Sequence, residues 1–155
     1  MSLYEQSRTW SNRGILRVNY DIAVYPTREK LMELAGSEEK SPVVMLNLLK
    51  FREVAEYKDG REEKISGREA YMRYGEAMRG IVEAGGGRML ISADLKDVVI
   101  GEVSDLWDVV ALVEYPSAAT FFAIAASPEV AEIGVHREAG LAGQLLIRSS
   151  LNNAI

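Results

Sequence analysis

Two stretches of this chain are apolar on both sides of an extended backbone, and this pattern constrains the fold more than any other feature. Residues 43–51 read Val-Val-Met-Leu-Asn-Leu-Leu-Lys-Phe, interrupted only by Asn47 and Lys50. Residues 108–115 likewise carry aliphatic side chains at odd and even positions. A strand of an antiparallel sheet with one wet face alternates apolar and polar residues. Both faces of this sheet therefore need to be covered.

The predicted elements follow one another in the order strand, helix, strand, strand, helix, strand. The strands are predicted at 42–51, 88–94, 108–115 and 142–150, and the helices at 67–84 and, in two pieces, 117–126 and 127–136. This order predicts an α+β, ferredoxin-like βαββαβ antiparallel sheet with its helices on one face. A second apolar piece at 98–100 predicts that the second strand continues past a bulge.

Local signals indicate where the helices begin and end. Ser66-Gly67-Arg68-Glu69 matches a capping box, in which Ser66 and Glu69 each bond the backbone N–H of the other. Ser127, followed by Pro128 and an acidic residue, starts another helix. The glycines at 85–87 follow a helix and precede a strand, so they end that helix. A phosphate-binding loop has the opposite order.

We expect residues 1–41 to form an N-terminal extension and residues 42–155 to form the ferredoxin-like domain. Pro26-Thr27 and Gly36 bound an extra helix at about 27–35, and residues 14–18 carry a weak strand pattern. The main helices cover only one face of the sheet. We therefore predict a homodimer in which the open faces of two sheets pack together. The alternative is that residues 1–40 fold back over the open face.

Composition excludes several classes of site and partner. The chain has no cysteine and one histidine, His136, which excludes disulfides, cysteine-ligated metals and multi-histidine metal sites within one chain. We predict neither a metal nor a cofactor. A net charge of −5 without a basic block argues against nucleic acid. Without a bilayer-spanning apolar run or a secretory signal, we expect a cytoplasmic protein with no membrane partner.

The cluster His136-Arg137-Glu138 is the strongest candidate for chemistry. Histidine titrates near neutral pH, so His136 is a candidate general acid or base. Arg137 is able to bind a carboxylate with two parallel hydrogen bonds. The alternative is structural: a histidine at a helix C-terminus, stabilised by the helix dipole, beside a solvated pair of Arg137 and Glu138.

Five further residues are candidates for substrate binding. They are Asn47, Tyr71, Arg88, Trp107 and Glu138. A buried Asn47 needs hydrogen-bond partners, which a ligand carbonyl, two backbone groups or a second subunit could supply. For Tyr71 and Trp107 the alternative is ordinary packing, and for Arg88 it is a surface position.

Several motifs together resemble the DUF1330 family, within the dimeric α/β-barrel superfamily. The motifs are the runs at 42–51 and 107–117, Ser66-Gly67-Arg68-Glu69-Ala70-Tyr71, Gly86-Gly87-Arg88, Ser127-Pro128-Glu129 and His136-Arg137-Glu138-Ala139-Gly140-Leu141. The resemblance covers about residues 26–149 and implies a ferredoxin-like fold and a dimeric α/β barrel. It implies no activity, because the superfamily includes cofactor-free monooxygenases, isomerase-like enzymes, haem binders and stress-responsive proteins, and fold does not fix function.

Three functional hypotheses follow. The first is a cofactor-free enzyme or binder of a small anionic or apolar metabolite, in a pocket that contains His136, Arg137 and Asn47. The second is a non-catalytic, dimeric structural or stress-related module. The third is a haem binder with His136 as the axial ligand.

Overall fold

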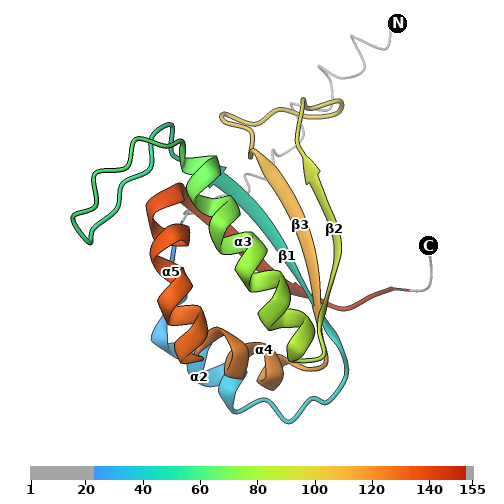
Figure 1. The fold of residues 1–155 in the computed structure, drawn as a ribbon. Helices are drawn as coiled ribbons and strands as arrows, with labels where there is room; N and C mark the ends of the chain where they lie inside the picture. The colour runs from blue at the N-terminus through green and yellow to red at the C-terminus, as the bar shows by residue number, and fades with distance from the viewer. Residues whose placement is uncertain (1–22, 153–155) are drawn as a thin grey trace, which may run out of the picture.

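A four-stranded antiparallel sheet forms the centre of the computed structural model, which describes residues 23–152 (Figure 1). Its strand order is β2-β3-β1-β4. The strands are β1 (Val43–Phe51), β2 (Arg88–Asp94), β3 (Val109–Tyr115) and β4 (Leu141–Ser149). This order and the alternation with helices are those of the ferredoxin-like fold, so the predicted fold class is confirmed. The weak strand pattern at 14–18 lies outside the described residues.

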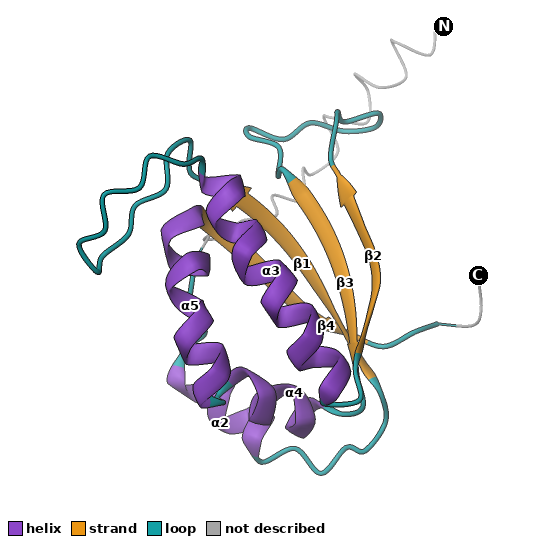
Figure 2. Ribbon diagram, viewed as in Figure 1, coloured by secondary structure: helices purple, strands orange, loops and turns teal. Residues whose placement is uncertain are grey.

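The helices pack on one side of the sheet (Figure 2). They are α2 (Arg28–Ala35), α3 (Gly67–Ala84), α4 (Ala118–Ala125) and α5 (Pro128–Gly140). The predicted capping box begins α3: Ser66 Oγ accepts from the Glu69 N–H at 3.1 Å, and Glu69 Oε2 accepts from the Ser66 N–H at 2.8 Å. Gly86 lies in the turn between α3 and β2. Its φ of 85° is in the left-handed region, which glycine adopts readily.

Strand register decides which side chains face the helices. Met45 lies opposite Val113, and Asn47 lies opposite Ala111. The odd-numbered residues of β1 and β3 form the core with α2, α3 and α4. The cluster contains Leu34, Val43, Met45, Val82, Val113, Tyr115, Ala118 and Ile124. Asn47 is therefore a polar side chain on the helix-facing side of the sheet.

Two glycines bring α3 and α5 into backbone contact where α3 begins and α5 ends. A Cβ added to Gly67 would lie 2.6 Å from the Gly140 carbonyl oxygen, and one on Gly140 would collide with the Gly67 carbonyl oxygen. Arg52 joins them, because its N–H donates to Gly140 and its carbonyl accepts from the Gly67 N–H. From this contact the two helices diverge (Figure 1). We call the contact the glycine apex.

Two predicted boundaries were wrong. Residues 98–100 do not continue β2: Val99 and Ile100 are 88% and 93% exposed in an irregular connection. The reason is that β3 pairs with β2 only from Val109 onward, so residues beyond Leu95 have no neighbouring strand. In addition, α5 continues past His136 to Gly140, which places His136 inside a helix.

Within residues 23–152, no single helix has both the length and the apolarity needed to cross a bilayer. The helices α4 and α5 meet that length and composition only together, and a 74° bend separates them.

Substituting Gly140→Ala should destabilise the protein, although alanine normally favours a helix. The added methyl group would enter the space of the Gly67 carbonyl oxygen and lie 2.9 Å from Tyr71 N. We expect the free energy of unfolding in urea to fall by about 1–3 kcal/mol. The matched control is Gly80→Ala in α3, where an added Cβ meets no atom within 4 Å. That variant should gain about 0.5–1 kcal/mol, and equal stability of the two variants would contradict the glycine apex.

Candidate ligand-binding cavity

A cavity of about 1500 Å³ lies between the helices and the helix-facing side of the sheet. This volume exceeds the roughly 300–1,000 Å³ typical of small-molecule pockets. The lining is mostly apolar. It includes Met45, Leu49, Met78, Val82, Met89, Val113, Phe121, Phe122, Ala131 and Leu146, with Val24 and Tyr25 at one edge.

A chain of polar side chains joins α5, β4 and β1 inside this cavity. Arg137 Nη2 donates to Gln144 Oε1 at 2.6 Å, and Gln144 Nε2 donates to Asn47 Oδ1 at 2.8 Å. Asn47 Nδ2 in turn donates to the backbone carbonyls of Met45 and Ala111, at 3.2 and 3.4 Å. Asn47 thus ties two backbone groups and orients Gln144, which in turn holds Arg137.

The guanidinium of Arg137 has only neutral hydrogen-bond partners in the described chain. Besides Gln144, Nη2 donates to the backbone carbonyl of Val24. The neighbouring Glu138 instead accepts from Lys58 and, at 2.8 Å, from the Tyr25 hydroxyl. The hydrogen bonds from Lys58 and Tyr25 hold the pKa of Glu138 below its ordinary value, and the charge of Arg137 lowers it further without a direct hydrogen bond. The alternative prediction of an Arg137–Glu138 pair therefore does not describe the geometry.

Two tyrosines of α3 line the cavity one turn apart. The ring centroids of Tyr71 and Tyr74 are 5.5 Å apart, and Tyr71 also packs on Phe51 at 5.4 Å. Within residues 23–152, neither hydroxyl has a hydrogen-bond partner. Burial raises the pKa of both phenols, and the positive charge of Arg137 acts in the opposite direction. Both hydroxyls are therefore protonated at neutral pH and free to donate.

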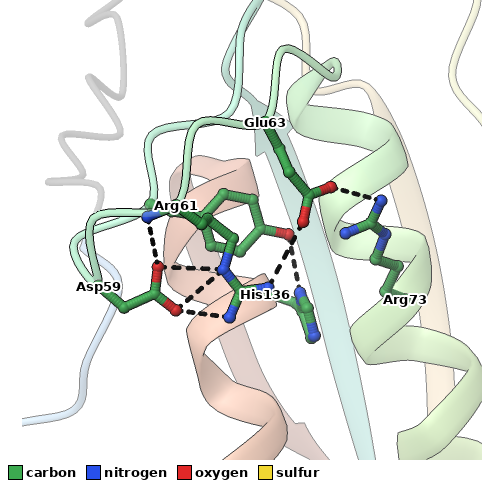
Figure 3. Close-up of polar contacts among 6 residues, drawn as sticks. Asp59, Arg61, Glu63, Arg73 and His136 are labelled. Atoms are coloured by element: carbon green, nitrogen blue, oxygen red, sulfur yellow. Dashed lines mark hydrogen bonds and ion pairs between the residues drawn. The ribbon is translucent and has the colours of Figure 1, made fainter.

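His136 points away from these groups, toward the loop of residues 53–65, which we call the strap. Its Nδ1 lies 2.7 Å from the Tyr57 hydroxyl oxygen. Figure 3 shows Asp59, Arg61 and Glu63 of the strap around His136, with Arg73 of α3 bound to Glu63 at 2.8 Å. Burial lowers the pKa of His136, and Arg61 and Arg73 lower it further, while Glu63 and Asp59 raise it. His136 is not among the residues that line the cavity.

The sequence candidates therefore divide between the cavity and other places. Asn47, Tyr71, Arg137 and Glu138 line the cavity. Arg88 instead pairs with Glu114 at 2.8 Å on an exposed part of the sheet, and Trp107 precedes β3 outside the lining. Sequence reasoning missed Gln144, although a polar residue inside the apolar last strand was a usable signal. Among the described residues, no three His, Cys, Asp or Glu side chains converge on a possible metal site.

The fold and cavity define a ferredoxin-like α+β protein with a large apolar pocket. A model of the family described as "Domain of unknown function (DUF1330)" matches residues 60–150. The chain belongs to this family.

Solved structures agree with that assignment. The methylated RPA0582 protein is 32% identical, with a TM-score of 0.77, over 86% of this chain and 98% of that one. A second structure of RPA0582, a protein of unknown function from Rhodopseudomonas palustris, is 31% identical, with a TM-score of 0.76, over 85% and 99%. A hydroxynitrile lyase from Passiflora edulis is 10% identical, with a TM-score of 0.50, over 76% and 99%, and shares the fold alone. Among proteins with curated functions, none matches.

The side chain of His136 should titrate below the ordinary histidine pKa of about 6.5. Because the folded-state pKa is lowered, the unfolded chain binds the proton more readily, and stability falls as the pH drops below that ordinary value. The chain has one histidine, so its ring resonances in NMR report this site alone. Arg61→Gln should raise the pKa of His136, whereas Arg28→Gln on α2 should not. A wild-type His136 pKa at or above the ordinary value of about 6.5 would contradict this description of its surroundings.

Proposed function

We propose that this protein binds a small, largely apolar carboxylate in the cavity, with Arg137 as the anion-binding group. The observation that carries the proposal is the half-buried guanidinium of Arg137, which has no carboxylate hydrogen-bonded to it within residues 23–152. Among the other cations of the lining, Arg68 pairs with Asp94, and Lys30 and Arg148 pair with Glu33, whereas Arg79 is exposed on α3. A guanidinium held in a low-dielectric site by neutral partners favours an incoming anion.

Tyr71 and Tyr74 supply the second element of this proposal. Each phenol retains its proton at neutral pH and has no hydrogen-bond partner within the described part of the chain. A phenol hydroxyl donates one hydrogen bond, so the two tyrosines complement the oxygens of a bound carboxylate. The remaining lining is apolar and suits a hydrocarbon body.

Binding, rather than acid–base catalysis, is the function that this geometry supports. The residue hypothesised as general acid or base, His136, contacts Tyr57 of the strap. A general base has to lie within hydrogen-bond reach of the proton that it abstracts. A ligand in the cavity meets Arg137, Gln144 and the two tyrosines instead.

Replacing Arg137 by Gln should weaken carboxylate binding. We expect octanoate to raise the melting temperature of the wild-type protein, because it binds only the folded state. Losing a charge-assisted hydrogen bond costs about 1.5–3 kcal/mol, so calorimetry should show affinity at least tenfold lower for Arg137→Gln. Arg88→Gln, which removes an arginine outside the cavity, should bind as the wild type does. Equal binding by Arg137→Gln would overturn the assigned role.

We further propose that the protein forms a homodimer through the open face of the sheet. The even-numbered residues of β1 and β3 and the odd-numbered residues of β4 point to that face. It carries Leu46, Leu48, Ile91, Val110, Leu112, Leu145 and Ile147, whereas Val44, which points the same way, is already buried in the single chain. Ile91 and Ile147 are 50% and 47% exposed. α2 packs against α4 on the helix side, so this part of the extension does not cover the open face. A two-fold copy of the same apolar face would do so.

Leu112→Glu should convert the dimer into a monomer. Leu112 lies opposite Leu46 at the centre of the open face, and a carboxylate there would be buried without a partner in the dimer. Sedimentation equilibrium at micromolar concentration should give the mass of two chains for the wild type and of one chain for the variant. Val99→Glu, on the exposed connection between β2 and β3, should remain dimeric. A monomeric wild type would contradict the proposal.

A further inference from the structure

We infer that the ligand is an elongated n-alkyl carboxylate, with its head at Arg137 and its chain running between α3 and α5 past Gly75 and Gly134. This inference rests on the proposed function, because it uses the same anion-binding group. It adds the shape of the ligand and the residues that accommodate its tail.

The residues of α3 and α5 that line the cavity form successive layers, one for each helical turn, starting next to the glycine apex. Tyr71 and Arg137 form the first layer. Gly75, one turn along α3, and Gly134, one turn back along α5, form the second. Met78 and Val130 form the third, and all six residues line the cavity. Tyr74, next to Gly75, also lines the cavity at the second layer, so a polar layer is followed by a layer that two glycines leave partly open and then by an apolar layer.

The second layer has open space where a helix normally carries side chains. A glycine inside a helix costs about 1 kcal/mol relative to alanine. At the glycine apex, backbone contact requires glycine, but a Cβ added to Gly75 or Gly134 would meet no atom within 4 Å. Close packing of the helices therefore does not explain these two glycines. Their effect is to leave room in the cavity directly behind the polar layer.

The Tyr71 hydroxyl supports placing the head of the ligand at the first layer. The side chain is enclosed between Phe51 and Tyr74, and it lines the cavity. Within residues 23–152 its hydroxyl has no hydrogen-bond partner, although a phenol hydroxyl is able to donate one hydrogen bond. A carboxylate at Arg137 would provide that partner at the end of the cavity where the head is placed.

The far part of the lining suits a flexible hydrocarbon chain. Met78, Val82, Met89 and Phe122 line it, and methionine side chains adapt to apolar groups of different shape. Tyr71 and Val82 are eleven residues apart on α3, which corresponds to about 16 Å along the helix axis. That length accommodates an alkyl chain of about ten carbons and exceeds what a compact metabolite would need.

A series of unbranched carboxylates tests this inference. Calorimetry with butanoate, octanoate and dodecanoate should show affinity rising about threefold to fourfold for each added CH₂ group. Gly75→Leu and Gly134→Leu should each reduce dodecanoate affinity at least tenfold, because the new side chain occupies the path of the tail. Butanoate binding, followed by NMR, should change less than threefold.

Gly80→Leu is the matched control, since Gly80 is an exposed glycine of α3 outside the lining. It should bind dodecanoate as the wild type does, and melting temperatures without ligand should show that all three variants fold. Two results would contradict the elongated shape of the ligand while leaving the proposed function standing. In the first, octanoate binds through Arg137 but affinity does not rise with chain length. In the second, Gly134→Leu binds dodecanoate as the wild type does. If no carboxylate of any length binds, both fail.

Discussion

The contact of Gly67 with Gly140 is the constraint on which the rest of the structure depends. It sets α3 and α5 close together at one end, and the divergence of the helices beyond it opens the space above the sheet (Figure 1). Side chains at the apex would push the helices apart along their length. Glycines thus have opposite roles in the same two helices, because the apex pair allows contact and the Gly75 and Gly134 pair leaves room.

Much of the fold could be predicted from local patterns. The capping box before α3 and the Ser-Pro start of α5 depend on neighbours within one turn, so the sequence contains all the information. The end of β2 could not be predicted in the same way. The apolar residues 98–100 look like a strand, but a strand also needs a partner, and β3 begins only at Val109.

The candidate site was harder to predict because helical geometry separates neighbours in sequence. His136 and Arg137 were interpreted as one cluster, with the helix ending near His136. Because α5 continues to Gly140, consecutive side chains point about 100° apart around its axis. His136 therefore faces the strap, and Arg137 faces the cavity. The link from Arg137 through Gln144 to Asn47 depends on the pairing register of β1 and β4, which local patterns do not specify.

The segment before α2 is hydrogen-bonded to two residues of the candidate site. The Ala23 carbonyl accepts from the Gln144 N–H at 2.8 Å, and the Val24 carbonyl accepts from Arg137. In the proposed complex, an anion that takes the same guanidinium edge would compete with that carbonyl, so occupancy of the cavity and docking of this segment would oppose each other thermodynamically. The polar end of the cavity is thus bordered by the main chain of Ala23 and Val24, and a head group that displaces the Val24 carbonyl would have to replace its hydrogen bond.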